Sequence, residues 1–177
     1  FCLVNDVAVA IRQLREEGRI RRAAVVDLDV HQGNGTARIF EHDRDVFTFS
    51  MHGDRNYPAV KMRSSLDVAL PDGTGDAPYL ATLDRHLPAV LDAANADIVF
   101  YVAGVDVAEG DRYGRLRLTD RGIRERDRRV IVSARERALP LAIVLAGGYA
   151  PTRERTAELH AQVFRAAAVD EAAGRGA

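Results

Sequence analysis

Residues 23–35 read AAVVDLDVHQGNG, and they give the strongest indication of how this chain folds. The four apolar residues at the start predict a buried β-strand, and Asp27, Asp29 and His31 follow at alternating positions. Side chains at i, i+2 and i+4 share one face of an extended chain, so we expect two carboxylates and one imidazole to project together. The glycines that follow allow the backbone to turn tightly around whatever these groups hold.

Carboxylate oxygens and imidazole nitrogens are ligands that a divalent ion such as Zn²⁺ or Fe²⁺ accepts. In open α/β sheets ligands bind at the carboxyl ends of the strands, which is where this cluster stands. The spacing therefore predicts a metal site. In the alternative interpretation, the Asp-x-Asp pair caps a loop and His31 is a satisfied structural residue.

The composition is that of an ordinary globular domain. The chain has 177 residues, 47% hydrophobic and 29% charged, with a formal net charge of -1, which suits one domain with a core. Nucleic-acid binding needs a concentrated basic surface, so we expect no direct contact with nucleic acid. The single cysteine excludes an intrachain disulfide. No apolar run approaches the ~20 residues that span a bilayer, so we expect a cytoplasmic protein without membrane contact.

Apolar strands and amphipathic helices alternate along the chain. Strands joined by helices form βαβ units, so we expect a single domain over residues 1–177 with three α/β/α layers and a mostly parallel sheet. Strands are expected at residues 23–28, 46–50, 66–70, 97–103 and 141–146, with 46–50, 97–103 and 141–146 buried. Helices are expected at about 6–18, 36–40, 76–91, 119–138 and 152–169, the first capped by Asn5 or Asp6 and the fourth by Thr119.

Two further strand ends carry informative residues. Asp106 follows the strand at 97–103, and Gly147-Gly148-Tyr149 follows the strand at 141–146. Parallel strands end at the same edge of a sheet, so we expect these side chains to converge with Asp29 and His31. Singly, Asp106 is equally well a turn residue and Tyr149 a packed aromatic. Together they supply three ligands and a hydrogen-bond donor, which is the make-up of an open catalytic metal site.

Segments along nearly the whole chain resemble the histone deacetylase superfamily. They are, in order, FCLVNDVA, DLDVHQGNGT, FTFSMHG, YP, LPDGTGD, AGVDVxEGDxxGRL and GGY. Gln32 and the MHG and NYP segments are most similar to class IV enzymes and their bacterial relatives. The resemblance implies an arginase/deacetylase-like α/β fold with its N-terminal part missing. It also implies a Zn²⁺-dependent amidohydrolase that acts on acyl-lysine or a small acylated amine.

The resemblance implies roles for individual residues as well. It makes Asp29, His31 and Asp106 the metal ligands and Tyr149 the residue that polarises the substrate carbonyl. Asp27 would belong to a buried charge network that orients a catalytic histidine. A structural K⁺ site is implied, largely through backbone carbonyls, at Asp27, Asp29, His31, Ser50 and Met51. A weaker monovalent site is implied at Phe40, Asp43 and Val46, and an acyl tunnel at Phe1, Gly147 and Gly148.

One departure from the family pattern concerns the general base. The family's paired histidines lie a few residues upstream of the FC motif, with which this chain begins. We therefore expect the 177 residues to be a segment of a longer protein that alone folds or binds metal poorly and is close to inactive. His52 is interpreted as structural. The other histidines outside the ligand set fall on helical or exposed-looking segments: His42, His86 and His160.

Two alternatives to a deacylase stay open. The strand followed by D-x-D also resembles the first motif of haloacid dehalogenase-like phosphohydrolases, which need Mg²⁺. In that interpretation Asp27 is the nucleophile, and Ser50 and Lys61 stand for the second and third motifs. The other alternative is a non-catalytic module that keeps the fold and binds a metal or an acylated ligand.

Overall fold

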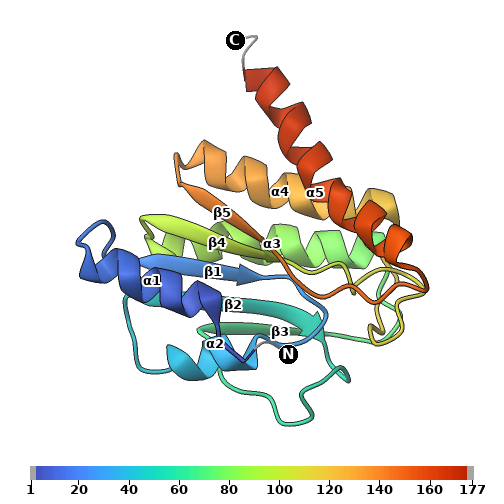
Figure 1. Cartoon of the computed structure of the whole chain (residues 1–177), viewed down its shortest axis with the longest axis horizontal. Helices are drawn as coiled ribbons and strands as arrows, with labels where there is room; N and C mark the ends of the chain where they lie inside the picture. The colour runs from blue at the N-terminus through green and yellow to red at the C-terminus, as the bar shows by residue number, and fades with distance from the viewer. Residues whose placement is uncertain (1–2, 175–177) are drawn as a thin grey trace.

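The computed structural model describes residues 3–174 and contains a five-stranded parallel sheet (Figure 1). The strands are β1 (Ala23–Asp27), β2 (Val46–Gly53), β3 (Leu66–Leu70), β4 (Ile98–Ala103) and β5 (Leu141–Leu145), in the spatial order β3-β2-β1-β4-β5. β1 lies in the centre and pairs with β2 on one side and β4 on the other. The predicted parallel sheet is confirmed. Its strand order reverses at β1, the kind of position at which open α/β sheets bind their ligands.

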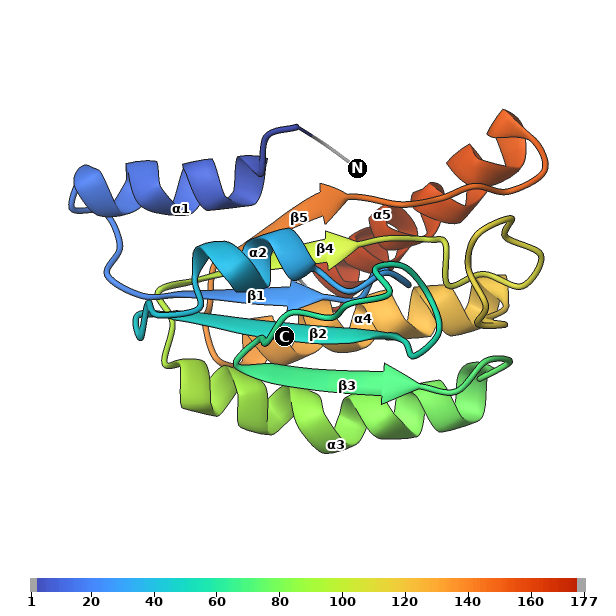
Figure 2. The same ribbon diagram turned by 90° about the horizontal axis from the view of Figure 1, so that it is seen from below.

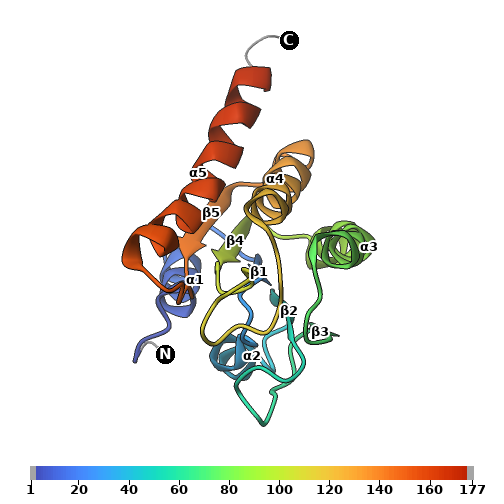
Figure 3. The same ribbon diagram turned by 90° about the vertical axis from the view of Figure 1, so that its right-hand side faces the viewer.

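Helices cover both faces of the sheet (Figures 2 and 3). One face carries α1 (Asp6–Glu16) and α2 (Asn34–Ile39), and the other carries α3 (Asp76–Ala94), α4 (Asp120–Glu136) and α5 (Arg153–Gly174). The larger core lies under the second group, where Tyr79, Val130 and Leu159 pack with Val26 of the sheet. A smaller core surrounds Ile11 of α1. The predicted α/β/α layering is confirmed.

The helix ends follow capping residues in the sequence. The Asn5 side chain accepts a hydrogen bond from the amide of Ala8 and begins α1, and Thr119 accepts one from Gly122 and begins α4, as predicted. Asn95 ends α3 in the left-handed conformation, with φ 42°. Within residues 3–174, no helix is long and apolar enough to cross a membrane.

Two strands differ from the sequence prediction. β2 continues to Gly53 because its last residues pair with β3, where Met51 lies opposite Val68. The strand expected at residues 46–50 is therefore three residues longer in the structure. The prediction that β5 is buried is wrong. Each of its residues is half-buried or exposed, since β4 is the only strand that pairs with it among the described residues.

Candidate metal centre

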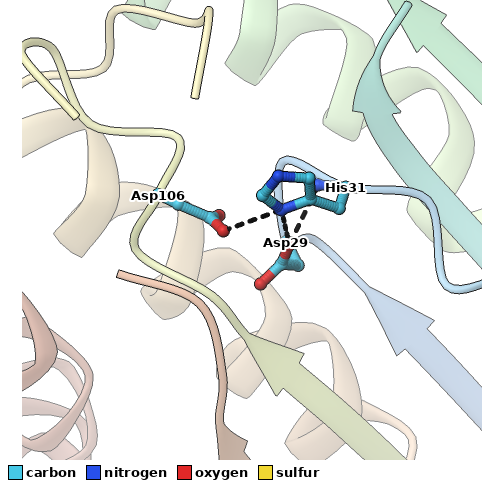
Figure 4. Close-up of side chains that lie close together, drawn as sticks. All are labelled: Asp29, His31 and Asp106. Carbon is cyan, nitrogen blue, oxygen red and sulfur yellow. Dashed lines mark hydrogen bonds and ion pairs between the residues drawn. The ribbon is translucent and has the colours of Figure 1, made fainter. Parts of the chain in front are cut away.

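Asp29, His31 and Asp106 lie together just beyond the carboxyl ends of β1 and β4 (Figure 4). The two strands are in register, with Asp27 opposite Val102, so the segments that follow them leave the sheet at the same place. The first segment carries Asp29 and His31, and the second carries Asp106. The structure thus brings together the three expected ligands among the four residues that the sequence predicts to converge.

The Nδ1 atom of His31 is the centre of this cluster. It lies 3.0 Å from Asp29 Oδ1 and 3.1 Å from Asp106 Oδ2. One potential ligand atom from each residue lies within 4.8 Å of the other two. Catalytic zinc sites use three protein ligands of these types and keep a further position for water or substrate. The donor chemistry and the spacing therefore fit Zn²⁺ or Fe²⁺.

Backbone amides orient both carboxylates. Gly147 N donates to Asp29 Oδ2 (2.8 Å) and Val30 N donates to Asp106 Oδ1 (2.8 Å), so each amide uses the oxygen that does not face His31. Position 147 has room only for glycine, because a Cβ there would lie 2.6 Å from Asp29 Oδ2 and 2.7 Å from Asp106 Cγ. Hydrogen bonds of this kind fix the orientation of metal ligands. Gly147 therefore supports the ligands, beyond the tunnel role implied by the sequence.

The three groups shift one another's pKa values. Burial raises the pKa of Asp106 to about 7, and the charge of Asp29 adds to the rise against the hydrogen bond from His31. Burial acts to lower the pKa of His31, but the hydrogen bonds and charges of Asp106 and Asp29 raise it to about 9. Burial acts to raise the pKa of Asp29, yet the hydrogen bonds from His31 and Gly147 leave it below its ordinary value. A metal ion therefore has to displace a proton from His31.

The residues implied for the structural K⁺ lie on β1, on β2 and in the segment after β1. Asp27 is opposite Ser50 in the sheet register, and Met51 follows Ser50 on β2. Asp27 is 7% exposed, and its Oδ1 accepts from the amide of Asp29 at 3.1 Å. Burial, followed by the charge of Asp29, raises its pKa well above the ordinary value. The cation role of these residues stays a prediction.

The residues implied for the second monovalent site lie along the turn that leads from α2 into β2, and Val46 is the first residue of β2. The amide of Asp43 donates to the carbonyl of Phe40 (3.0 Å), and the amide of Val46 donates to the carbonyl of Asp43 (3.3 Å). The Asp43 carboxylate pairs with Arg15 of α1 at 2.6 Å. Hydrogen bonds within the turn are sufficient to explain its conformation. Its role in cation binding also stays a prediction.

Tyr149 lies at the edge of the metal cluster. Its ring centroid is 6.3 Å from that of His31, and the two rings meet edge to face at 83°. The pKa of Tyr149 is raised, first by burial and then by the charges of Asp106 and Asp29. Gly148, the neighbouring tunnel residue of the prediction, packs tightly: a Cβ there would lie 2.6 Å from Val105. Phe1, the third tunnel residue, lies outside the described residues.

Sequence reasoning assigned no role to two residues that hold Tyr149. Asp111 Oδ2 accepts the backbone amide of Tyr149 at 2.7 Å, and its Oδ1 accepts the amides of Tyr113 and Gly114. The Tyr113 ring meets that of Tyr149 edge to face, with 4.9 Å between centroids. The G-D-x-x-G spacing, which is turn chemistry, was the available signal for Asp111.

Among the described residues, no second histidine joins the metal cluster. His52 is 2% exposed and hydrogen-bonded to Ser50 Oγ at 3.0 Å, as the structural interpretation expects. His42 is exposed, also as expected. His160 lies on a helix, as expected. It is half-buried on α5, and Gly148 leaves room for it, because a Cβ there would lie 3.1 Å from His160 Nε2.

Comparison with known proteins identifies similar sequences over most of the chain. A family model described as the histone deacetylase domain matches residues 1–167. An uncharacterised protein of Picosynechococcus sp. is 46% identical over 167 residues, which are 94% of this chain and 56% of that protein. Histone deacetylase 2 of Arabidopsis thaliana is 34% identical over 158 residues, which are 88% of this chain and 41% of that protein. The chain spans about half the length of the curated relatives it matches.

Solved structures are also similar over most of the chain. Acetylpolyamine aminohydrolase from Burkholderia pseudomallei superposes with a TM-score of 0.80 at 29% identity, over 93% of this chain and 49% of that one. The HDA15 HD domain superposes with a TM-score of 0.77 at 27% identity, over 93% of this chain and 50% of that one. The arginase/deacetylase-like fold expected from the sequence is confirmed.

Proposed function

The chain belongs to the histone deacetylase family, and we propose that the intact protein is a Zn²⁺-dependent hydrolase that removes an acyl group from an acylated amine. The observation that carries this proposal is the cluster of Asp29, His31 and Asp106 with the ring of Tyr149 beside it. These groups are the ligand set and the hydrogen-bond donor that a metal-assisted amide hydrolysis requires.

Each group has a part in the proposed reaction. Asp29, His31 and Asp106 hold the ion, for which Fe²⁺ is the alternative. When bound, the ion supplies Lewis-acid polarisation of the amide carbonyl and lowers the pKa of water toward ~7. Tyr149 donates its hydroxyl proton in a hydrogen bond to the oxygen that becomes negative as the amide is attacked. A phenol is protonated at neutral pH even at its ordinary pKa, and the pKa of Tyr149 is raised further, so the donor is present when it is needed.

We propose acyl-lysine in a protein, or a small acylated amine, as the substrate. The names of two similar proteins, a histone deacetylase and an acetylpolyamine aminohydrolase, support these two classes. Tyr113, 61% exposed and in contact with Tyr149, would contact the substrate where it enters the site. A structural K⁺ at Asp27 and Ser50 and a cytoplasmic location belong to the same proposal.

We expect the intact protein to supply the general base of this reaction. In the family it is one of the paired histidines upstream of the FC motif, and no histidine of the described residues other than His31 lies in the metal cluster. General-base assistance contributes ~10²–10⁴ in rate, so a metal cluster without such a base should hydrolyse amides only slowly.

The phosphohydrolase alternative finds little support in the geometry. Lys61, its third motif, donates through Nζ to the carbonyls of Asn56 (2.7 Å) and Pro58 (2.6 Å). Asp27, its nucleophile, is 7% exposed and hydrogen-bonded to the backbone. A nucleophile has to reach the phosphate, and this carboxylate is covered.

The test compares wild-type full-length protein with its His31→Ala and Tyr149→Phe variants. Elemental analysis should find tightly held zinc or iron in the wild type and in Tyr149→Phe, and a loss of metal in His31→Ala. Hydrolysis of a panel of acetylated and longer acylated amines should fall in both variants. Phosphate-ester hydrolysis that survives His31→Ala would instead support the phosphohydrolase. Binding of acylated amines by the wild type without any turnover would support the non-catalytic module.

A further inference from the structure

Arg126 of α4 is a fully buried cation on the side of the ligand-bearing segments that faces the helices. Its side chain is 0% exposed. The Nη1 atom donates to the carbonyl of Leu28 (3.2 Å) and to the carbonyl of Gly104 (2.6 Å). The Nε atom donates to Asp127 Oδ1 (2.9 Å), and Nη2 lies 2.8 Å from the same oxygen. One guanidinium therefore joins α4 to two separate segments of the sheet edge.

The two carbonyls belong to the segments that carry the proposed metal ligands. Leu28 immediately precedes Asp29, and Gly104 stands two residues before Asp106. The hydrogen bond from Leu28 N to Val102 O (3.1 Å) continues the β1–β4 pairing beyond the end of β1. The buried carbonyls of Leu28 and Gly104, which lie beyond the ends of β1 and β4, need other donors, because an unpaired buried carbonyl is costly. Arg126 satisfies both of them with a single nitrogen, which fixes the spacing between the two segments.

The position of the guanidinium is itself determined by its surroundings. Asp127 Oδ1 also accepts the hydroxyl of Tyr101 at 2.5 Å, and the Arg126 guanidinium lies 5.9 Å from the centre of the Tyr101 ring. Asp127 is 1% exposed, so this is a buried ion pair. Replacing such a pair by apolar residues of similar volume is often neutral or stabilising, so the pair is weak evidence for a role in stability.

We propose that Arg126, held by Asp127 and Tyr101, is a positioning residue that sets the distance between the segments of Asp29 and Asp106 and thereby the affinity and geometry of metal binding. Hydrogen bonds behind the ligands commonly tune metal affinity by ~10–100-fold. The inference rests on the proposed function, since it requires that the cluster binds a metal.

The test removes the whole polar group at once in the full-length protein. The triple variant Arg126→Met, Asp127→Leu and Tyr101→Phe removes the buried ion pair and the hydroxyl bonded to it. It leaves the carbonyls of Leu28 and Gly104 without this donor, which is the contact under test. The hydroxyl of Tyr79, which is buried beside Arg126, also remains. The matched control is Arg128→Met, which removes an arginine of the same helix that is paired with Glu125 at the surface. We would measure the dissociation constant of Zn²⁺ by competition with a chromogenic chelator and record the visible spectrum of the Co²⁺-loaded protein. Circular dichroism and thermal unfolding would establish folding.

The triple variant should fold, bind Zn²⁺ ~10–100-fold more weakly and show an altered Co²⁺ spectrum, whereas the control should match the wild type in all three. Arg126→Lys keeps the charge but cannot reach both carbonyls and Asp127 together. The affinity of this variant for Zn²⁺ should therefore lie between those of the wild type and the triple variant. A folded triple variant with wild-type affinity and spectrum would overturn this inference alone. If neither variant folds, the group serves the fold and the inference is likewise overturned. If the wild type binds no divalent ion, the proposed function falls with it.

Discussion

The affinity of the full-length protein for Zn²⁺ should fall steeply as the pH is lowered, because a proton on His31 competes with the ion. Burial acts to lower the pKa of His31, but Asp106 and Asp29 raise it to about 9. The Nδ1 atom must lose its proton before it can act as a ligand. Each pH unit below about 9 therefore weakens apparent binding about tenfold, and binding at about pH 7 should be about 100-fold weaker than its high-pH limit.

The second protonation makes the dependence steeper at lower pH. The pKa of Asp106 is raised to about 7 by burial, so below that value a second ligand must also release a proton. The slope should then approach about 100-fold per pH unit. Calorimetry should accordingly find about one proton released per bound ion between about pH 7 and pH 9, and nearly two below about pH 7.

The assay is a chelator competition between about pH 6 and pH 10, an interval that includes the raised pKa values of both Asp106 and His31. Calorimetry in two buffers with different ionisation enthalpies would count the protons released. His42→Gln is the control, because His42 is exposed and lies outside the cluster. Its slope should equal that of the wild type. An affinity that is constant between about pH 7 and pH 8, with no proton released, would refute the reasoning.

Three further predictions concern the same site. Tyr149→Phe should keep its metal and lose ~10²–10³ in turnover, measured on an acetylated amine; unchanged turnover would remove Tyr149 from the mechanism. Gly147→Ala should weaken zinc binding, because its Cβ would lie 2.6 Å from Asp29 Oδ2. The control Gly35→Ala should bind zinc as the wild type does, because its Cβ would approach only Asn5, at 3.9 Å. Equal zinc affinities of the two variants would contradict the packing argument. In the metal-free protein, the contribution of His31 to stability should be complete below pH 6.5, the pKa of His31 in the unfolded chain, and should be lost as the pH rises through about 9. The measurement is the melting temperature in the presence of a chelator. A melting temperature that rises between these two pH values would count against this prediction.

The sequence could predict the parts of the site that depend on local spacing. Asp29 and His31 share a face because they lie two residues apart after an apolar strand. Asp106 could be added because parallel strands end at one edge, although 75 residues separate it from His31 in the chain. The partial exposure of β5 could not be predicted in this way. Its five apolar residues are typical of a buried strand, and only the strand order places it at the edge.

The sequence indicates that Arg126 is buried, but it does not indicate which groups Arg126 contacts. It stands in RERDRRV, a run of charges that is typical of a solvated helix face. The phase of the helix nevertheless places Arg126 three residues after Ile123 and four before Val130, on the buried stripe. An arginine on such a stripe must find acceptors inside the protein, because burying an unpaired cation is prohibitively costly. Which acceptors it finds depends on how α4 packs against the ends of β1 and β4, so the link between this helix and the metal ligands could be established only from the three-dimensional structure.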